Sequence, residues 1–129
     1  MTIGGQAVTT GVLAALLGAC AWGCGPDAAP QACTALAAVG LTVDVTDAAT
    51  GQPLCEAKLT ATEGGYAEEL SRVACSYIGA VERPGTYVVR AEAPGFVSKE
   101  VAAVRVTMDE GRCPHVRGVR LSMALVPEG

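Results

Sequence analysis

The chain has 129 residues, of which 50% are hydrophobic but only 4% aromatic, and its net charge is −4. This length fits one domain, whose core must be built mainly from Val, Leu and Ala. The nine basic residues form no cluster that would follow a phosphate backbone, so we expect no nucleic-acid partner.

The first segment is an apolar run over residues 8–19. It is shorter than the roughly 20 residues of a membrane-spanning helix and is typical of a signal peptide, which we place at residues 1–19. Leu17-Gly18-Ala19-Cys20 resembles a bacterial lipobox, in which Cys20 receives the lipid and becomes the first mature residue. No Lys or Arg precedes the run, a departure that a start codon upstream of Met1 would explain. The alternatives are a buried amino-terminal helix with a chance cysteine, and lipidation at Cys24.

The next segment, residues 20–38, contains Gly25-Pro26 and Pro30 and shows no periodicity. Such a composition is typical of a linker, so we expect a lipid-anchored tether that carries a domain over residues 39–126.

The first two strands are expected over residues 39–46 and 55–62, where apolar and polar residues alternate. The turn between them, residues 47–53, contains Asp47 and Gly51, both suited to a tight turn. These features predict a hairpin. The residues expected to face inward are Leu41, Val43, Val45, Cys55, Ala57, Leu59 and Ala61.

The middle of the chain gives a weaker pattern. Gly64-Gly65 ends the second strand, and residues 66–75 predict a bulge or a short third strand. Residues 76–82 lead into the clearest strand of the chain, residues 83–96, which has a Pro-Gly turn at each end. Its alternation places Tyr87, Val89, Ala91 and Ala93 inward and Arg90 and Glu92 outward.

Two strands remain toward the carboxyl end. Residues 97–108 predict a strand with Ala102, Val104, Val106 and Met108 inward and a bulge near Val101. After a turn at residues 109–112, the last strand turns Val119, Leu121, Met123 and Leu125 inward.

Six or seven short strands without a helix predict an all-β fold, a seven-stranded antiparallel β-sandwich. We exclude parallel pairing because no crossover helix separates the strands. Val43, Leu59, Tyr87 and Leu121 are expected to meet in the core.

Six cysteines without a zinc-type CxxC pair indicate an oxidising compartment and disulfides. A lipid on Cys20 leaves five, and Cys24 in the tether is expected to be the free one. The remaining four cysteines allow three pairings. We favour Cys55 with Cys75, which holds the weakly patterned segment, and Cys33 with Cys113, which joins the start of the domain to the turn before the last strand.

No catalytic, cofactor-binding or metal-binding residues are predicted. The chain has one histidine, His115, whereas a zinc peptidase needs at least two and a carboxylate. Cys113-Pro114-His115 suggests a thiol or metal pair, but a structural disulfide beside an exposed histidine is favoured. Asp44, Asp47, Asp109 and Glu110 are favoured as solvated turn charges over calcium ligands.

Three motifs at residues 45–54, 84–91 and 93–96 resemble the carboxypeptidase regulatory-like domain, a transthyretin-like or prealbumin-like sandwich. The resemblance covers residues 39–126 and implies that Tyr87 lies in the core and that the domain is a non-catalytic appendage. Gly51, Gly85 and Gly95 stand where its turns need positive φ.

The combined expectation is a non-catalytic lipoprotein of the cell envelope, exported and anchored in the membrane through its lipid, whose sandwich is a binding or structural module for a protein or glycan ligand. The alternative is a transthyretin-like hydrolase of a small ring compound. Only His115 would serve that chemistry, and the carboxy-terminal Tyr-Arg-Gly-Ser pattern of such enzymes is missing.

Overall fold

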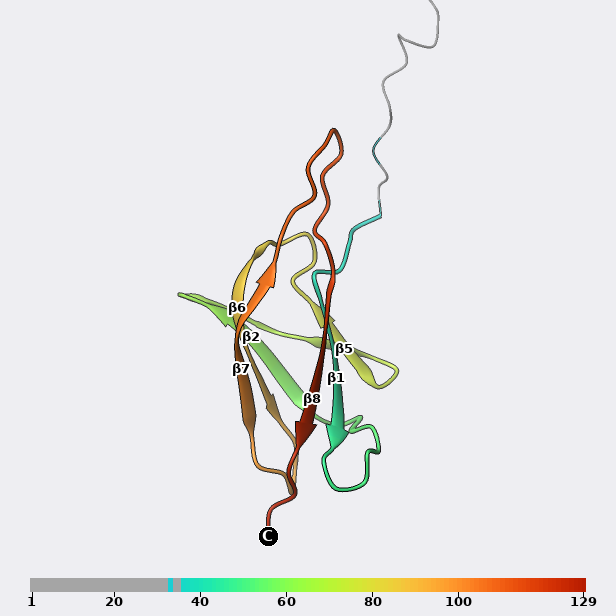
Figure 1. The fold of residues 1–129 in the computed structure, drawn as a ribbon, viewed down its shortest axis with the longest axis vertical. Coiled ribbons are helices and arrows are strands. Elements are labelled where there is room, and N and C mark those ends of the chain that lie inside the picture. The colour runs from blue at the N-terminus through green and yellow to red at the C-terminus, as the bar shows by residue number, and fades with distance from the viewer. Residues whose placement is uncertain (1–32, 34–35) are drawn as a thin grey trace, which may run out of the picture. The chain divides into compact units, whose positions relative to one another are not determined.

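The computed structural model describes Cys33 and residues 36–129. The regular secondary structure of these residues consists of β-strands alone (Figure 1). The all-β prediction is confirmed for this part of the chain. The predicted count of seven strands is wrong, because the described residues form eight. They are β1 Leu41–Asp47, β2 Lys58–Glu63, β3 Tyr66–Glu69, β4 Ser71–Val73, β5 Ser76–Gly79, β6 Gly85–Glu92, β7 Lys99–Val106 and β8 Val119–Leu125.

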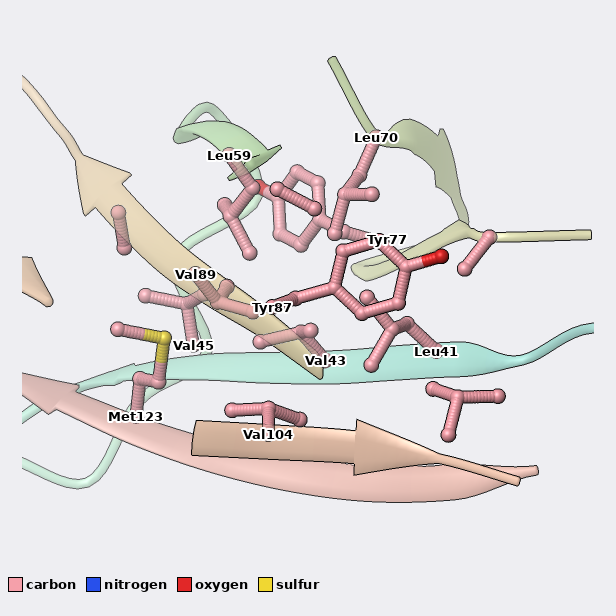
Figure 2. Packing of buried hydrophobic residues seen from close by; sticks show 14 of the residues in the cluster. Leu41, Val43, Val45, Leu59, Leu70, Tyr77, Tyr87, Val89, Val104 and Met123 are labelled. Carbon is pink, nitrogen blue, oxygen red and sulfur yellow. The ribbon is translucent and has the colours of Figure 1, made fainter. Parts of the chain in front are cut away.

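The strands form two four-stranded sheets, with the orders β4-β5-β1-β8 and β3-β2-β6-β7. Their apolar faces share one core, to which Leu59 and Tyr87 come from one sheet and Val43 and Tyr77 from the other (Figure 2). No polar or charged residue is buried among the described residues. Burial of apolar surface is therefore the main force that holds the sheets together.

The predicted hairpin between the first two strands is wrong. The turn after β1 forms as expected, since the Asp47 carboxylate accepts a hydrogen bond from the Ala49 amide at 2.7 Å. However, β1 pairs with β5 and β8, whereas β2 lies in the other sheet and pairs with β3 and β6. Alternation identifies which side chains face the core, but both sheets share that core, so it does not identify the partner strand.

The exclusion of parallel pairing is also wrong. β1 and β8 run parallel over seven residue pairs, from Leu41 opposite Val119 to Asp47 opposite Leu125. Parallel neighbours need a long connection, and here the other six strands provide it in place of a helix.

The weakly patterned middle segment forms three short strands. β3 and β4 belong to different sheets, and the chain crosses between the sheets at Leu70, which is 5% exposed and donates its amide to the Leu59 carbonyl at 2.9 Å. β5 follows after a tight turn in which Ala74 has φ 57°. No strand was predicted at residues 76–79, where β5 lies, although Tyr77 is buried there. Strands of three or four residues are too short to show a clear period.

The predicted bulge in the seventh strand is confirmed. The register of β7 against β6 shifts just after Val101, where Ala103 takes φ 59°. Because the extra residue changes the register, Ala102 is exposed. Met108 lies beyond the end of β7 and is also exposed, so the inward prediction is wrong for both residues.

In β8 the inward residues alternate as predicted, but their burial is unequal. Met123 and Leu125 are buried, whereas Val119 and Leu121 are partly buried and pack at the core margin. β8 is an edge strand, so its first half has less cover than a central strand. Leu121 is therefore not one of the central core residues, as Val43, Leu59 and Tyr87 are.

Two of the three turn glycines take the expected conformation, with φ 80° at Gly51 and 84° at Gly95. The prediction for Gly85 is wrong, because its φ is not positive. A Cβ at this position would lie 2.6 Å from Oε1 of Glu63, whose carboxylate accepts the Thr86 amide at 2.8 Å. Gly85 thus provides room for a carboxylate that caps the start of β6.

Leu59→Ala should lower the free energy of unfolding by about 2–5 kcal/mol, because Leu59 is 0% exposed and its truncation leaves a cavity. The control is Arg105→Ala on the exposed face of β7, which should change it by no more than about 0.5 kcal/mol. Urea unfolding of the two variants measures both values. Equal losses would contradict the described inside and outside of the sheets.

Candidate binding groove

Two adjoining hollows of about 440 and 240 Å³ lie beside the loop that follows β1 and the turn between β6 and β7. They share four lining residues and form one groove, which we call the loop groove. The shared residues are Glu56, Ala93, Pro94 and Phe96; Lys58, Glu92 and Ser98 line the larger lobe, and Pro53, Leu54 and Cys55 line the smaller lobe.

One wall of the loop groove is the segment 53–57. The Leu54 amide donates to the Val45 carbonyl of β1 at 2.8 Å. From the core, the Tyr77 hydroxyl donates to the Leu54 carbonyl at 2.7 Å and accepts from the Ala57 amide at 2.9 Å. Apart from the bridge between Pro53 and Thr46, this segment has no strand pairing, and these hydrogen bonds fix it to β1 and β5.

The β4–β5 hairpin holds the same wall at two further points. Cys75 forms a disulfide with Cys55, the pairing that the sequence analysis favoured, with a Cα–Cα distance of 4.6 Å. The Arg72 guanidinium donates to the Cys55 carbonyl. A bridge across 20 residues contributes about 3 kcal/mol in the chain-entropy model, so it restrains this wall substantially.

The opposite wall is the turn at residues 93–98. Its Phe96 amide donates to the Ala93 carbonyl at 3.1 Å, and Gly95 takes the positive φ that this turn requires. The segment after β8 secures the turn, since Val97 donates to the Val126 carbonyl at 2.8 Å and Glu128 donates to the Gly95 carbonyl at 2.9 Å. At the lower end of the molecule in Figure 1, both walls thus rest on strands of the sheets.

The charged groups of the loop groove are accessible. Glu56 and Lys58 are exposed and have no ion-pair partner among the described residues. Glu92 pairs with Arg90 at 3.5 Å on the outer face of its sheet, which is a weak exposed contact. The groove therefore offers an apolar wall, a free carboxylate and a free ammonium group, a set suited to binding.

His115 lies outside the loop groove, in the segment between β7 and β8. Its Nδ1 contacts the Glu82 carboxylate, and its Nε2 is buried without a hydrogen-bond partner. The predicted exposure of this histidine is wrong, because its side chain is only 25% exposed. The neighbouring Cys113 is disulfide-bonded, as the preferred interpretation of this motif required.

Glu82 joins three segments. Its carboxylate also accepts the amides of Ala38 at 2.9 Å and Val116 at 3.2 Å. The pKa of Glu82 is held below its usual value of 4.5, mainly by the hydrogen bond to His115 and next by the bond from the Ala38 amide. Glu82 takes φ 50°, a strained conformation that these bonds maintain.

Three of the four carboxylates considered for calcium, Asp44, Asp47 and Asp109, bind protein groups. Asp44 accepts hydrogen bonds from the Ser76 hydroxyl at 2.6 Å and from Arg120 at 2.8 Å, and Asp109 pairs with Arg117 at 2.8 Å. Within residues 36–129 and Cys33, no group of three or more His, Cys, Asp or Glu side chains is placed to hold a metal ion.

The remaining predicted site residues fall partly beyond the described structure. Cys20 and Cys24 lie outside the described residues. Cys33 is disulfide-bonded, while its pairing with Cys113 stays a prediction. These disulfides are compatible with an exported, non-cytoplasmic protein.

Cys33 and residues 36–129 contain no helix that is long and apolar enough to cross a membrane. No protein-family model matches the chain, and a search of curated proteins gives no match.

The loop groove was not predicted from the sequence. Its lining residues come from two segments, 53–58 and 92–98, more than thirty positions apart. The available signals were Pro53 and Pro94-Gly95-Phe96, which were interpreted as turns and as parts of the resemblance motifs, and not as a binding surface.

Glu82→Gln should remove the part of the folding stability that the wild type has at neutral pH and loses in acid. Because the folded protein lowers the pKa of Glu82, its ionised form stabilises the fold above the usual value of 4.5, and this contribution is lost as pH falls through the folded pKa. The difference in melting temperature between wild type and variant should be largest near neutral pH and shrink below about pH 4.5.

The control for this experiment is Glu110→Gln, which alters an exposed glutamate of the neighbouring turn. A difference between wild type and Glu82→Gln that stays constant from pH 7 to pH 3 would contradict the assigned role of this carboxylate.

Proposed function

We propose that the chain is an exported lipoprotein, anchored in a membrane of the cell envelope through Cys20, and that its two-sheet domain is a non-catalytic binding module of the carboxypeptidase regulatory-like kind. The ligand, a protein or a glycan, binds in the loop groove. The observation that carries this proposal is a groove whose walls are fixed by both sheets and two of whose charged groups, Glu56 and Lys58, have no ion-pair partner among the described residues.

A fixed groove favours binding because little conformational entropy is lost when the ligand arrives. Tyr77, Arg72 and the Cys55–Cys75 disulfide hold one wall, and the segment after β8 holds the other. Binding sites commonly lie on loops that a rigid scaffold positions, and this groove has that construction.

The hydrolase alternative is less well supported, because it needs a base that reaches the substrate. His115 is the one histidine of the chain. One of its ring nitrogens is engaged with Glu82, and the other is buried. This geometry favours a structural role for the imidazole.

The amino-terminal sequence supports the proposed lipid anchor. An apolar run followed by Leu17-Gly18-Ala19-Cys20 supplies the small residues that a lipoprotein signal peptidase requires before the modified cysteine. A disulfide-containing domain after such a segment agrees with export to an oxidising compartment.

Metabolic labelling with a fatty-acid analogue in a bacterial host should tag the wild-type chain and fail to tag Cys20→Ala, because the thiol of this cysteine carries the lipid. Cys24→Ala is the matched control and should keep the tag. Equal labelling of wild type and Cys20→Ala would refute the anchor, and loss of label in Cys24→Ala alone would move it to Cys24.

The purified full chain should bind at least one member of a panel of glycans and envelope proteins. Tyr77→Phe should weaken that binding, because it removes the hydroxyl that fixes Leu54 and Ala57. Tyr87→Phe is the matched control, since its hydroxyl bonds the Arg83 carbonyl at 2.7 Å and touches neither wall. Surface plasmon resonance measures both affinities.

Binding that both tyrosine variants leave unchanged would place the ligand outside the loop groove. Hydrolysis of hydroxyisourate by the wild type, with no binding to any panel member, would support the enzyme alternative.

A further inference from the structure

We propose that the ligand of the loop groove is an extended peptide segment that carries a Lys or Arg side chain beside apolar residues, proline among them. This inference rests on the proposed binding function of the groove and specifies its ligand.

The shape of the groove favours an elongated ligand. The larger lobe reaches Lys58, Glu92 and Ser98, and the smaller lobe reaches Pro53 and the Cys55–Cys75 disulfide. Both lobes share the wall formed by Pro94 and Phe96. A ligand that occupies both lobes must pass along this wall, as an extended chain does.

The charge of the smaller lobe favours a cation. Glu56 is the one charged residue among those that line it. Its carboxylate is exposed and has no ion-pair or hydrogen-bond partner among the described residues, so it is free to accept a ligand ammonium or guanidinium group. A protein with net charge −4 also attracts a basic peptide at long range.

The shared wall favours apolar residues next to that cation. Phe96 is partly exposed, and Pro53 and Pro94, whose rings carry no amide hydrogen, line the same lobe. Grooves lined by aromatic and apolar residues bind polyproline II peptides, because this conformation costs the peptide little entropy to adopt.

The larger lobe supplies donors for the peptide backbone. Lys58 has a free ammonium group, and the Ser98 hydroxyl accepts a bond from Arg90 at 3.2 Å, which leaves its own hydrogen available. A polyproline II chain has unpaired carbonyl oxygens that accept such bonds. Glu56 lines both lobes, but in the larger lobe Lys58 repels a cation and Glu92 is already paired with Arg90, so we place the basic side chain in the smaller lobe.

The test is selection from a random octapeptide library displayed on beads, with the purified full chain as bait. Selected peptides should be enriched in Lys or Arg flanked by proline and other apolar residues. Glu56→Gln should weaken the best peptide about tenfold, and the affinity of the wild type should fall as salt rises. Phe96→Leu, which keeps an apolar side chain without the ring, should also weaken binding.

Glu69→Gln is the matched control, because Glu69 is an exposed glutamate of β3 that does not line the groove, and it should leave the affinity unchanged. Three results would overturn the inference: no enriched peptide, enriched peptides without a basic residue, or equal affinity for wild type and Glu56→Gln. A glycan whose binding needs Tyr77 but not Glu56 would overturn it and still support the proposed binding function.

Discussion

The hydroxyl groups of two buried tyrosines connect the core of this domain to its loops. The core is otherwise apolar, so a tyrosine ring is accommodated only if its hydroxyl finds a partner at the core margin. Tyr77 finds it in the wall segment of the loop groove, and Tyr87 finds it in the Arg83 carbonyl before β6. The packing of the two sheets therefore also determines where these loops lie.

Arg83 extends this connection on the other side of the core. Its guanidinium donates to Glu63 at 2.9 Å and lies 3.5 Å from the centre of the Tyr66 ring. The Tyr66 hydroxyl in turn donates to Glu68 at 2.7 Å. The bond to Glu68 is the main reason that the pKa of Tyr66 is raised. These contacts join loop, strand and ring without burying a charge, which would cost stability.

How much the sequence predicts depends on the range of the interaction involved. Alternation within one strand identified Leu41, Val43 and Val45 as core residues, because burial on one face is a local pattern. The same alternation says nothing about pairing, so the neighbours of β1 were predicted incorrectly. Pairing depends on contacts between distant segments, such as the parallel alignment of Leu41 with Val119.

The loop groove was beyond prediction for the same reason. Glu56 and Phe96 appear in the sequence as an exposed glutamate and a residue after a turn, and only the packing of two sheets brings them to one surface. The disulfide pairing was easier to infer, because Cys55 and Cys75 flank one weakly patterned segment and lie 20 residues apart.

The crossing of the chain at Leu70 also limits how this domain can associate with copies of itself. An edge strand exposes unpaired amide and carbonyl groups that can recruit another chain, and a long straight edge is the most hazardous. Because the crossing divides one run of the chain between the sheets, the edge on this side consists of β3 with four residues and β4 with three. Neither strand is long enough to guide extended pairing, so these two edges disfavour association of one copy of the domain with another.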